Sequence, residues 1–413
     1  MKIGFIGLGK LGLPVALAVE SKGHEVIGYD ISAKVKNIID TKKIPYKEIW
    51  AQGYLNNSKI KFDNIKNVVL HSDIIFVPIQ TPHDPLYEGV TRMPEERVDF
   101  NYKHLIKGMK DLSDEIEKQK KNKVVIIIST VLPGTIKREI KPLLGKYTKL
   151  CYNPFFIAMG TTINDFLNPE FILFGVDDIA AAEKAEKFYK TITNSIFFKT
   201  TIENAELIKV TYNTFISTKI AFINTVMELC HKLPNTNIDD VTNALSLASK
   251  RLISNAYLRG GMGDGGGCHP RDNIALSWLA RKLDVSIDFF EHIMLQREKQ
   301  TEWFVSLIEE NLFNDKIYIL GKSFKPETNI TTGSPAILLY NLLKEKKYLP
   351  IHYDPFLDKK KINFEKGTYF IATKHDIFEK FNFPKGSVVI DPFRIIDKNL
   401  KNVKVISIGN NID

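Results

Sequence analysis

Short apolar runs alternate with amphipathic stretches over the first two hundred residues of the chain. Glycine, proline or polar residues bound most of these runs, as is typical of buried strands. Strands that alternate with helical stretches indicate βαβ units and a parallel sheet. The expected strands are Lys2–Ile6, Glu25–Tyr29, Ile74–Pro78, Val124–Ser129, Leu150–Tyr152 and Phe171–Phe174.

The pattern changes at about Thr201. The stretch Glu203–Lys232 contains neither proline nor glycine, which predicts one long helix. Further helices are expected across Ile238–Asn255 and Ile274–Asn311, and alternation of strands and helices returns after Asp315. The expected elements there are strands at Lys316–Leu320, Leu349–Tyr353, Thr368–Ala372, Val388–Ile390 and Val403–Ile406, and a helix at Ser334–Lys344.

These patterns predict an α/β protein in which a long central helix joins two Rossmann-like, doubly wound domains. The expected boundaries are 1–200 for the first domain, 201–311 for a helical region, and 312–413 for the second α/β domain. The polar segment Asp84–Arg97 contains two prolines and is expected to form a surface loop or lid.

Composition excludes several classes of protein. The 413 residues are 44% apolar and 25% charged, as in ordinary globular proteins. The cysteines are Cys151, Cys230 and Cys268; this odd, widely spaced set argues against a disulfide framework and favours a reducing cytoplasm. The net charge is +9, but the lysines are scattered and no basic run is interleaved with aromatics, so we expect an anionic substrate rather than nucleic acid.

Membrane insertion is not expected either. No apolar run reaches transmembrane length. Spaced glycines interrupt the apolar start of the chain, and a second strand pattern follows closely. We therefore interpret this start as mature structure rather than a signal peptide.

A glycine-rich turn follows the first expected strand. Its sequence is Gly7-Leu8-Gly9-Lys10-Leu11-Gly12, it opens a helix, and Asp30 ends the next strand. The glycines permit a tight turn, close approach of a pyrophosphate and close packing of the helix, while the acid can bind ribose hydroxyls. The order of these features favours dinucleotide binding, and Asp30 favours NAD over NADP. The alternative is a glycine-rich turn with a solvent-exposed aspartate.

Two further groups follow expected strands. Thr81 and Thr130 each follow a strand of the first sheet, and ligands bind at the carboxyl ends of such strands. Phe324 and Lys325, which follow a strand of the second α/β domain, suit a base or sugar and a phosphate. The alternatives are ordinary loop hydroxyls and a plain surface loop.

One face of the long helix carries a polar stripe. Glu206, Lys209 and Asn213 lie at positions i, i+3 and i+7, and Asn224 continues the stripe. Polar groups on a packed helix need partners. Lys209 could stabilise an oxyanion and Asn213 could hold a hydroxyl or a water molecule. The alternative is a solvated helix face.

The segment with the most chemical information is Gly265-Gly266-Gly267-Cys268-His269-Pro270-Arg271-Asp272. Three glycines allow a ligand or another backbone to approach closely. The thiol that follows lies beside Arg271 and a helix start, both of which favour a thiolate nucleophile. Asp272 either caps a helix that begins near Asn273 or steers a base or a water molecule. The alternative for Cys268 is an inert, buried thiol.

In this order, the motifs resemble those of the UDP-glucose/GDP-mannose dehydrogenase family over nearly the whole chain. The resemblance implies oxidation of C6 of a nucleotide sugar to a carboxylate with two molecules of NAD. It also implies an N-terminal NAD-binding domain and a C-terminal nucleotide-sugar domain. The residues that match the family's motifs are Gly7, Gly9, Gly12 and Asp30 in the cofactor fingerprint, Thr130 in the S-T-V-x-x-G-T motif, the oxyanion Lys209 and its Asn213, the nucleophile Cys268 with Asp272 four residues on, and the substrate-binding Arg251, Phe324 and Lys325. We also expect Leu11 and Thr81 to contact the cofactor and Gly265 to contact the substrate.

The chain also departs from the family pattern. Phe155 and Met159 occupy the two glutamate positions of the P-E-F-[LR]-x-E-G segment, and the first glutamate is thought to manage water in thioester hydrolysis. Ile330 and Thr332 replace the aspartate and arginine of the D-x-R-x-S-P motif. His269 replaces an aromatic or aliphatic residue, and Arg271 replaces a lysine. The departures indicate a divergent subgroup.

The resemblance implies a cytoplasmic, NAD-dependent oxidoreductase of polysaccharide biosynthesis that acts on UDP-glucose through a Cys268 thiohemiacetal and thioester. Arg251 and the long helix suggest a homodimer, and no metal, nucleic acid or membrane is expected to take part. The alternatives are a UDP-N-acetylhexosamine or GDP-mannose 6-dehydrogenase, a β-hydroxyacid dehydrogenase, and a nucleotide-binding protein that has lost turnover.

Overall fold

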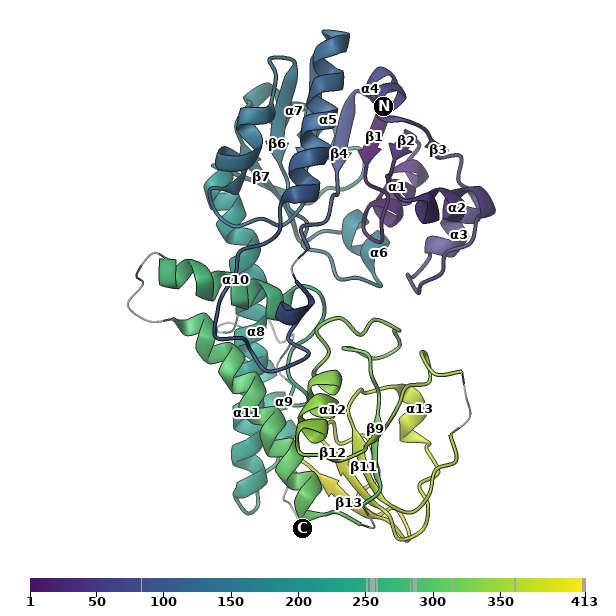
Figure 1. The fold of residues 1–413 in the computed structure, drawn as a ribbon, viewed down its shortest axis with the longest axis vertical. Coiled ribbons are helices and arrows are strands. Elements are labelled where there is room, and N and C mark those ends of the chain that lie inside the picture. The colour runs from purple at the N-terminus through teal and green to yellow at the C-terminus, as the bar shows by residue number, and fades with distance from the viewer. Residues whose placement is uncertain are drawn as a thin grey trace. The chain divides into compact units, whose positions relative to one another are not determined.

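The computed structural model describes residues 1–82, 84–249, 252, 257, 259–282, 284, 288–313, 315–359 and 362–410. It divides into two compact units. Unit 1 comprises Met1–Pro82 and Phe100–Thr211, and unit 2 comprises His83–Asp99 and Tyr212–Asp413. The helix α8 (Ile202–Lys232) begins in unit 1 and continues into unit 2, as expected for an uninterrupted run without proline or glycine (Figure 1). The predicted α/β fold with a long connecting helix is confirmed.

Unit 1 contains an eight-stranded sheet of order β3-β2-β1-β4-β5-β6-β7-β8. Its first six strands follow the doubly wound order 3-2-1-4-5-6, in which ligands bind at the carboxyl ends of the strands, where the order reverses. All neighbours are parallel except β6 and β7, so the prediction of a parallel sheet is wrong for that pair. The strands are β1 (Lys2–Ile6), β2 (Glu25–Tyr29), β3 (Lys61–Phe62), β4 (Ile74–Val77), β5 (Lys123–Ile127), β6 (Thr148–Tyr152), β7 (Phe171–Val176) and β8 (Ile196–Thr200).

Helices cover both faces of this sheet. Side chains alternate along β1, so Ile3 and Phe5 join the core under α1, α6 and α7. On the other face a Cβ on Gly4 would meet Val68 of α4, which packs beside α5. The helices are α1 (Gly12–Ser21), α2 (Ala33–Thr41), α3 (Ala51–Asn57), α4 (Ile65–His71), α5 (Lys103–Gln119), the π-helical turn η2 (Ile136–Ile140), the 3₁₀ turn η3 (Lys141–Leu143), α6 (Thr162–Leu167) and α7 (Ile179–Tyr189).

Unit 2 contains a five-stranded, fully parallel sheet of order β10-β9-β11-β12-β13. This is the second common doubly wound order, 2-1-3-4-5, with its switch point between β9 and β11. The strands are β9 (Ile317–Leu320), β10 (Ile351–Tyr353), β11 (Thr368–Ile371), β12 (Val388–Asp391) and β13 (Lys404–Ser407).

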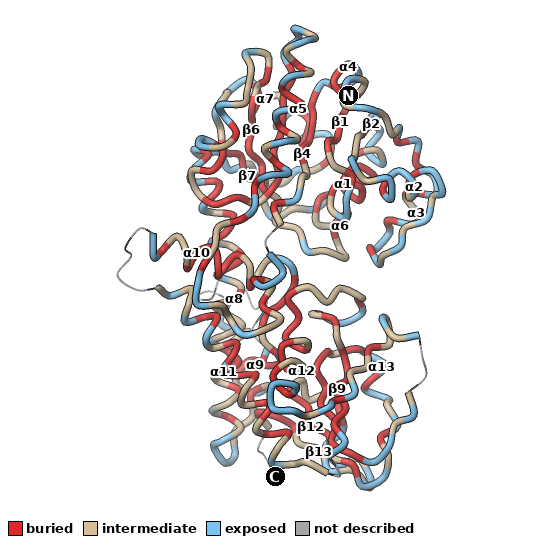
Figure 2. Tube along the Cα trace, viewed as in Figure 1, coloured by how far each residue is buried: buried red, intermediate tan, exposed pale blue. Residues whose placement is uncertain are grey.

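Two apolar cores flank the second sheet, and its central strands are buried (Figure 2). One face packs against α8, α11 and α12 through residues such as Met227, Phe304 and Leu339, and the other face packs against α13 through Phe378. The helices that follow α8 are α9 (Ile238–Ser246), α10 (His269–Lys282), α11 (Phe289–Glu310), α12 (Pro335–Glu345) and α13 (Asp376–Glu379).

The segment 84–99 interrupts unit 1 in sequence but belongs to unit 2. It forms the 3₁₀ turn η1 (Pro85–Tyr87) and is tied to α11 and α12 by polar contacts. Arg92 pairs with Glu302 and Glu345, and the buried Arg97 pairs with Glu291 at 3.2 Å. The segment reaches the surface, as expected, and these ion pairs connect it to α11 and α12.

Unit 2 contains both the predicted helical region and the predicted second α/β domain without a division between them. The predicted boundary at residue 311 therefore remains a prediction. Within the described residues, no helix is both long and apolar enough to cross a membrane. That same part of the chain brings together no group of three or more histidine, cysteine, aspartate and glutamate side chains that could bind a metal ion.

Candidate active site

The glycine-rich turn of unit 1 connects β1 directly to α1. Gly7 has a φ of +110°, which favours glycine, and its amide donates to the carbonyl of Tyr29 at 2.7 Å. A Cβ on Gly12 would lie 2.3 Å from the carbonyl oxygen of Gly7, so the helix can begin here only with glycine. A Cβ on Gly9 would meet nothing within 4 Å, which leaves this face of the turn open. The turn therefore fits a pyrophosphate at the N-terminus of α1.

Asp30 follows β2 and holds the same turn. Its Oδ2 accepts from the amide of Leu8 at 2.7 Å, and its Oδ1 accepts from the amide of Ser32 at 2.8 Å. The carboxylate of Asp30 is therefore fixed beside the glycine turn, which is where the ribose-binding acid of a dinucleotide site lies.

Thr81 and Thr130 come together at the ends of β4 and β5. The hydroxyl of Thr81 is buried and donates to the carbonyl of Thr130 at 2.7 Å. This hydroxyl therefore joins the loops after β4 and β5 at the carboxyl edge of the sheet, next to the switch point between β1 and β4. The sequence alone predicted the position of both residues but not this bond.

Glu206 explains how the loop after β5 is held. Its side chain is fully buried, and its two carboxylate oxygens accept from the amides of Gly134 at 2.6 Å and Ile136 at 2.8 Å. Burial raises the pKa of Glu206 to about 7, against the opposing effect of these two hydrogen bonds. The first residue of the predicted polar stripe on α8 is thus buried in unit 1, where Glu206 fixes the loop that carries Thr130.

Lys209 lies one turn further along α8 and is also buried. Its Nζ lies 5.1 Å from the ring centroid of Phe156, within the range of a cation–π contact. Phe155, which occupies a glutamate position of the family pattern, is partly buried and packs against Phe166 of the core of unit 1 at a centroid distance of 5.6 Å. The site of the missing carboxylate is therefore apolar.

A buried acid reaches the same loop from elsewhere in the sequence. Glu48 accepts from the amides of Gly160 at 2.8 Å and Thr162 at 2.7 Å. It therefore fixes the segment after Met159 and the start of α6. The sequence analysis did not single out Glu48, because its partners are backbone groups more than a hundred residues away.

The glycines before Cys268 make close contacts within unit 2. A Cβ on Gly265 would lie 2.8 Å from the Cβ of Phe324, and one on Gly266 would lie 3.0 Å from its ring. The predicted substrate residues Gly265 and Phe324 are thus neighbours. The side chain of Phe324 occupies the space that these two glycines leave. Cys268 is half-buried and directly precedes α10.

Asp272 is buried in the first turn of α10. Its Oδ2 accepts from the side-chain amide of Asn213 at 2.6 Å, and its Oδ1 accepts from Arg271 Nε at 2.9 Å. The amide of Asp272 donates to the carbonyl of Cys268, so the helix begins at His269. The prediction of a helix starting near Asn273, capped by Asp272, is wrong. The pairing of Asn213 with Asp272 brings two predicted catalytic residues together.

Further along α8, two more polar residues hold the loop of Cys268. Ser217 donates to Asp264 Oδ2 at 2.7 Å and lies 3.1 Å from Nδ1 of His269. That nitrogen also contacts the carbonyl of Asn213 at 3.2 Å, which can only accept, so we assign the hydrogen to Nδ1. Asn224 accepts from the amide of Gly261 at 3.0 Å. The predicted continuation of the polar stripe is confirmed.

The loop that carries Phe324 and Lys325 follows β9 and is held by a buried cluster. Asp354 accepts from the amides of Lys322 at 2.7 Å and Ser323 at 3.1 Å, and His375 Nε2 lies 3.2 Å from Asp354 and 3.0 Å from Ser323 Oγ. Burial raises the pKa of Asp354, but the hydrogen bonds from His375 and the backbone outweigh it and hold the pKa well below its usual range.

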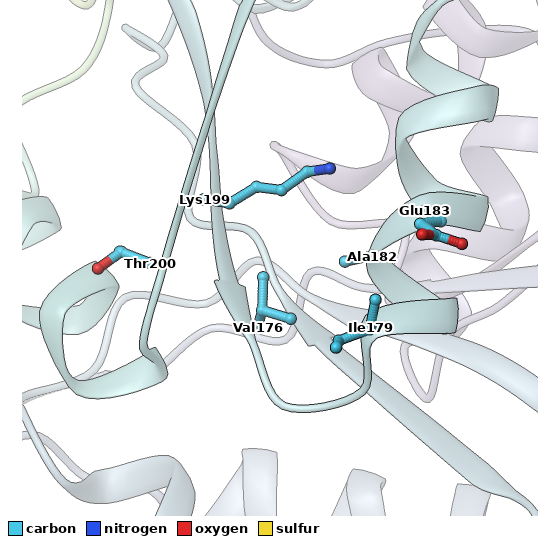
Figure 3. A pocket seen from close by; sticks show the side chains of 6 residues that line it. All are labelled: Val176, Ile179, Ala182, Glu183, Lys199 and Thr200. Carbon is cyan, nitrogen blue, oxygen red and sulfur yellow. The ribbon is translucent and has the colours of Figure 1, made fainter.

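One predicted site residue and one surface hollow are not part of the arrangements described above. Arg251 lies outside the described residues. A surface hollow of about 300 Å³ lies between β7, α7 and β8, lined by Val176, Ile179, Ala182, Glu183, Lys199 and Thr200 (Figure 3). None of the predicted site residues lines it, so we do not assign it to the candidate site.

Comparison with known proteins agrees with this geometry. Residues 1–193 match the model of the UDP-glucose/GDP-mannose dehydrogenase family, NAD binding domain, and residues 203–296 match the model of its central domain. The chain belongs to the UDP-glucose/GDP-mannose dehydrogenase family. Its cofactor is accordingly NAD, and the glycine turn with Asp30 fits that cofactor.

Relatives in this family differ in substrate. The chain is 28% identical to a UDP-glucose 6-dehydrogenase of Rickettsia conorii, with 96% of each chain covered. It is also 28% identical to a GDP-mannose 6-dehydrogenase of Pseudomonas aeruginosa, with 99% of this chain and 91% of that protein covered.

Solved structures share the fold over the whole chain. A UDP-glucose dehydrogenase from Pyrobaculum islandicum aligns with a TM-score of 0.85 at 23% identity, covering 98% of this chain and 96% of the other. A UDP-D-ManNAc dehydrogenase from Pyrococcus horikoshii aligns with a TM-score of 0.82 at 23% identity and full coverage of both chains.

Proposed function

We propose that the protein oxidises C6 of a UDP-sugar, with UDP-glucose as the first candidate, to the uronate through a covalent intermediate on Cys268. The observation that carries this proposal is the arrangement in unit 2, where Cys268 directly precedes α10 and Asp272, in the first turn of that helix, accepts a hydrogen bond from Asn213. Membership of the family supports the reaction class. The second α/β sheet, with Phe324 against Gly265, favours a nucleotide sugar over a small hydroxyacid.

The proposed chemistry assigns a role to each residue. NAD, when bound, accepts a hydride from C6 in each of two oxidations. The Cys268 thiolate adds to the C6 aldehyde carbon and forms a thiohemiacetal, which is oxidised to a thioester. Water then breaks the carbon–sulfur bond, releasing the uronate and the thiol. Cys268 directly precedes the N-terminus of α10, a position that suits the negative charge of the attacking sulfur.

Polar residues around the nucleophile and on α8 would stabilise charge and place water. Lys209 is assigned to the oxyanion, Asn213 and Thr130 to a water molecule, and Asp272 to the acid–base step. Asp272 already accepts from Asn213 and Arg271, so its carboxylate orients the amide of Asn213. Lys325 and Phe324 are assigned to the nucleotide, and Arg251 to the substrate of a neighbouring subunit.

A homodimer is part of this proposal. Phe215 and Phe222 lie seven residues apart on one face of α8, and both are exposed. Exposed aromatic side chains on one helix face fit an interface with a second copy of this chain.

The test is incubation of the enzyme with NAD and a panel of UDP-glucose, UDP-N-acetylhexosamines, GDP-mannose and small hydroxyacids. We expect two NADH per uronate with a UDP-sugar. The Cys268→Ser variant should bind NAD normally but lose at least about a thousandfold in uronate formation, since serine is a poor nucleophile without an adjacent base. NADH formed only with hydroxyacids, binding without NADH, or full turnover by the serine variant would each contradict the proposal.

A further inference from the structure

A buried arginine outside the predicted site occupies the middle of unit 2. Arg297 lies on α11 and is only 2% exposed. Its Nε donates to the carbonyl of Asp264 at 3.1 Å and lies 3.0 Å from Asp264 Oδ1. Its Nη1 donates to the carbonyl of Gly89 at 2.6 Å, and its Nη2 donates to the carbonyl of Gly333 at 2.8 Å. One guanidinium therefore binds three segments that are far apart in sequence.

One of these segments is part of the loop of Cys268, and the other two pack against that loop. Asp264 belongs to that loop. A Cβ on Gly333 would lie 2.4 Å from the carbonyl oxygen of Gly266, and the amide of Gly266 donates to the neighbouring Thr332 at 3.1 Å. A Cβ on Gly89 would lie 2.7 Å from the Cβ of Pro270. The hydrogen bonds of Arg297 thus hold the loop on both sides of the cysteine.

The partner acid extends the contacts to α8. Asp264 is buried and accepts from Ser217, which also contacts His269, the residue after Cys268. A charge this deeply buried is costly unless it is fully paired, and removal of one partner leaves the other uncompensated. A lysine could not replace Arg297, because a single ammonium cannot reproduce a planar fork that reaches three acceptors.

The location of Arg297 also bears on a departure from the family pattern. Thr332 occupies the position where the family pattern has an arginine. In this chain, a guanidinium from α11 binds the next carbonyl, that of Gly333.

We propose that Arg297 is a positioning residue for Cys268, which it serves by clamping the loop 261–268 through Asp264, Gly89 and Gly333. The catalytic purpose of this clamp rests on the proposed function, whereas the clamp itself rests only on the contacts above.

The test compares Arg297→Lys with the matched control Arg92→Lys. Arg92 also lies in unit 2 and bridges two acids, but it is half-exposed and does not touch the loop of Cys268. Hydrogen exchange of residues 261–272 and the alkylation rate of Cys268 by iodoacetamide are measured first. We expect Arg297→Lys to speed exchange in this loop and to change the alkylation rate, each by about tenfold, because the clamped geometry is lost. The control, and exchange at β1 and α1, should match wild type.

Single-turnover kinetics then distinguish positioning from a general loss of folding. The active fraction is titrated by alkylation of Cys268, while the buried Cys151 and Cys230 report unfolding. In the folded fraction of Arg297→Lys, we expect the rate constant of NADH formation to fall by about ten- to a hundredfold, as for a displaced reacting group, with NAD affinity unchanged. A variant that loses only amplitude or melting temperature, at a wild-type rate constant, would reduce Arg297 to a structural residue.

Two safeguards keep the result decisive. If Arg297→Lys does not fold, Asp264→Asn removes the charge of the partner and should loosen the same loop. If the wild type oxidises no nucleotide sugar, the proposed function fails, but loop exchange and alkylation still test the clamp. Exchange and alkylation within twofold of wild type, in whichever of the two variants folds, would overturn the proposal.

Discussion

At the scale of single residues, Asp30 shows which roles a sequence can reveal. The glycine turn and the acid at the end of β2 were predictable, because each residue type is required by local backbone geometry and by its position after a strand. Arg297, Asp264 and Glu48 were not predictable in this way. Arg297 and Gly89 are 208 residues apart, so no local pattern connects them.

The contacts of Asp30 predict that its removal weakens the binding of NAD. Asp30→Ala removes the acid assigned to the ribose and also leaves the amides of Leu8 and Ser32 without their acceptor. We expect NAD binding to weaken by about 1–3 kcal/mol, the cost of polar partners left unsatisfied. The affinity for a UDP-sugar should stay near wild type. Calorimetric titration with each ligand measures both, and equal losses would contradict the assignment of Asp30 to the cofactor.

At the scale of elements, most strands and the long helix were predictable from periodicity and from the positions of glycine and proline. The two-residue strand β3 is too short to give a pattern, and β8 is a largely exposed edge strand without clear alternation. The expected helical stretch 274–311 forms two separate helices, α10 and α11. The antiparallel pairing of β6 and β7 depends on the path of the chain between strands, which side-chain periodicity does not encode.

The side chain of Glu206 on α8 is expected to make the stability of unit 1 depend on pH. Its pKa is raised to about 7 in the fold, above the ordinary value of an unfolded glutamate. A carboxyl group with a raised pKa stabilises the folded state fully below its unfolded pKa and loses that contribution as the pH rises through about 7. Glu206 should therefore make unit 1 more stable at pH 5 than at pH 8, by about 1–3 kcal/mol.

The variant Glu206→Gln isolates this contribution. The amide does not titrate, so the difference in the free energy of unfolding between pH 5 and pH 8 should shrink by that amount, although the variant is less stable at both. Glu183→Gln, at an exposed position on α7, is the control. Urea unfolding at the two pH values provides the measurement. A pH dependence identical to that of wild type would show that Glu206 keeps the same protonation state throughout.

At the scale of the whole molecule, the loops after β1 and β9 are held by the same pattern of hydrogen bonds in the two sheets. The amide of Gly7 donates to Tyr29 and that of Gly321 donates to Tyr353, both at 2.7 Å, and φ is +110° and +105°. Asp30 and Asp354 then each accept from the amide that follows the glycine, again at 2.7 Å. No sequence repeat reveals this likeness, because only a glycine, a tyrosine and an aspartate are shared. The likeness supports nucleotide binding by the loop after β9, as the proposed function requires.

Phe155 bears on the rate of the last step of the proposed reaction, the hydrolysis of the thioester, so this prediction rests on the proposed function. Phe155 is partly buried and packs against the apolar core of unit 1 where the family pattern has a glutamate, and an aromatic ring cannot accept a proton from water. Hydrolysis of the Cys268 thioester must then depend on a less direct group, such as Asp272 or water held by Asn213 and Thr130. We expect this step to be the slowest in the cycle, so that the acyl-enzyme accumulates.

Rapid mixing should therefore show a burst of NADH followed by slower turnover, and mass spectrometry of quenched enzyme should find the sugar adduct on Cys268. The variant Phe155→Glu would restore a carboxylate at the position where the family pattern has a glutamate. Its carboxylate would face the packing around Phe166, so a faster second phase should come with a lower melting temperature. A linear trace from the first turnover, without an adduct on Cys268, would mean that another group in this protein activates water as efficiently as the missing glutamate.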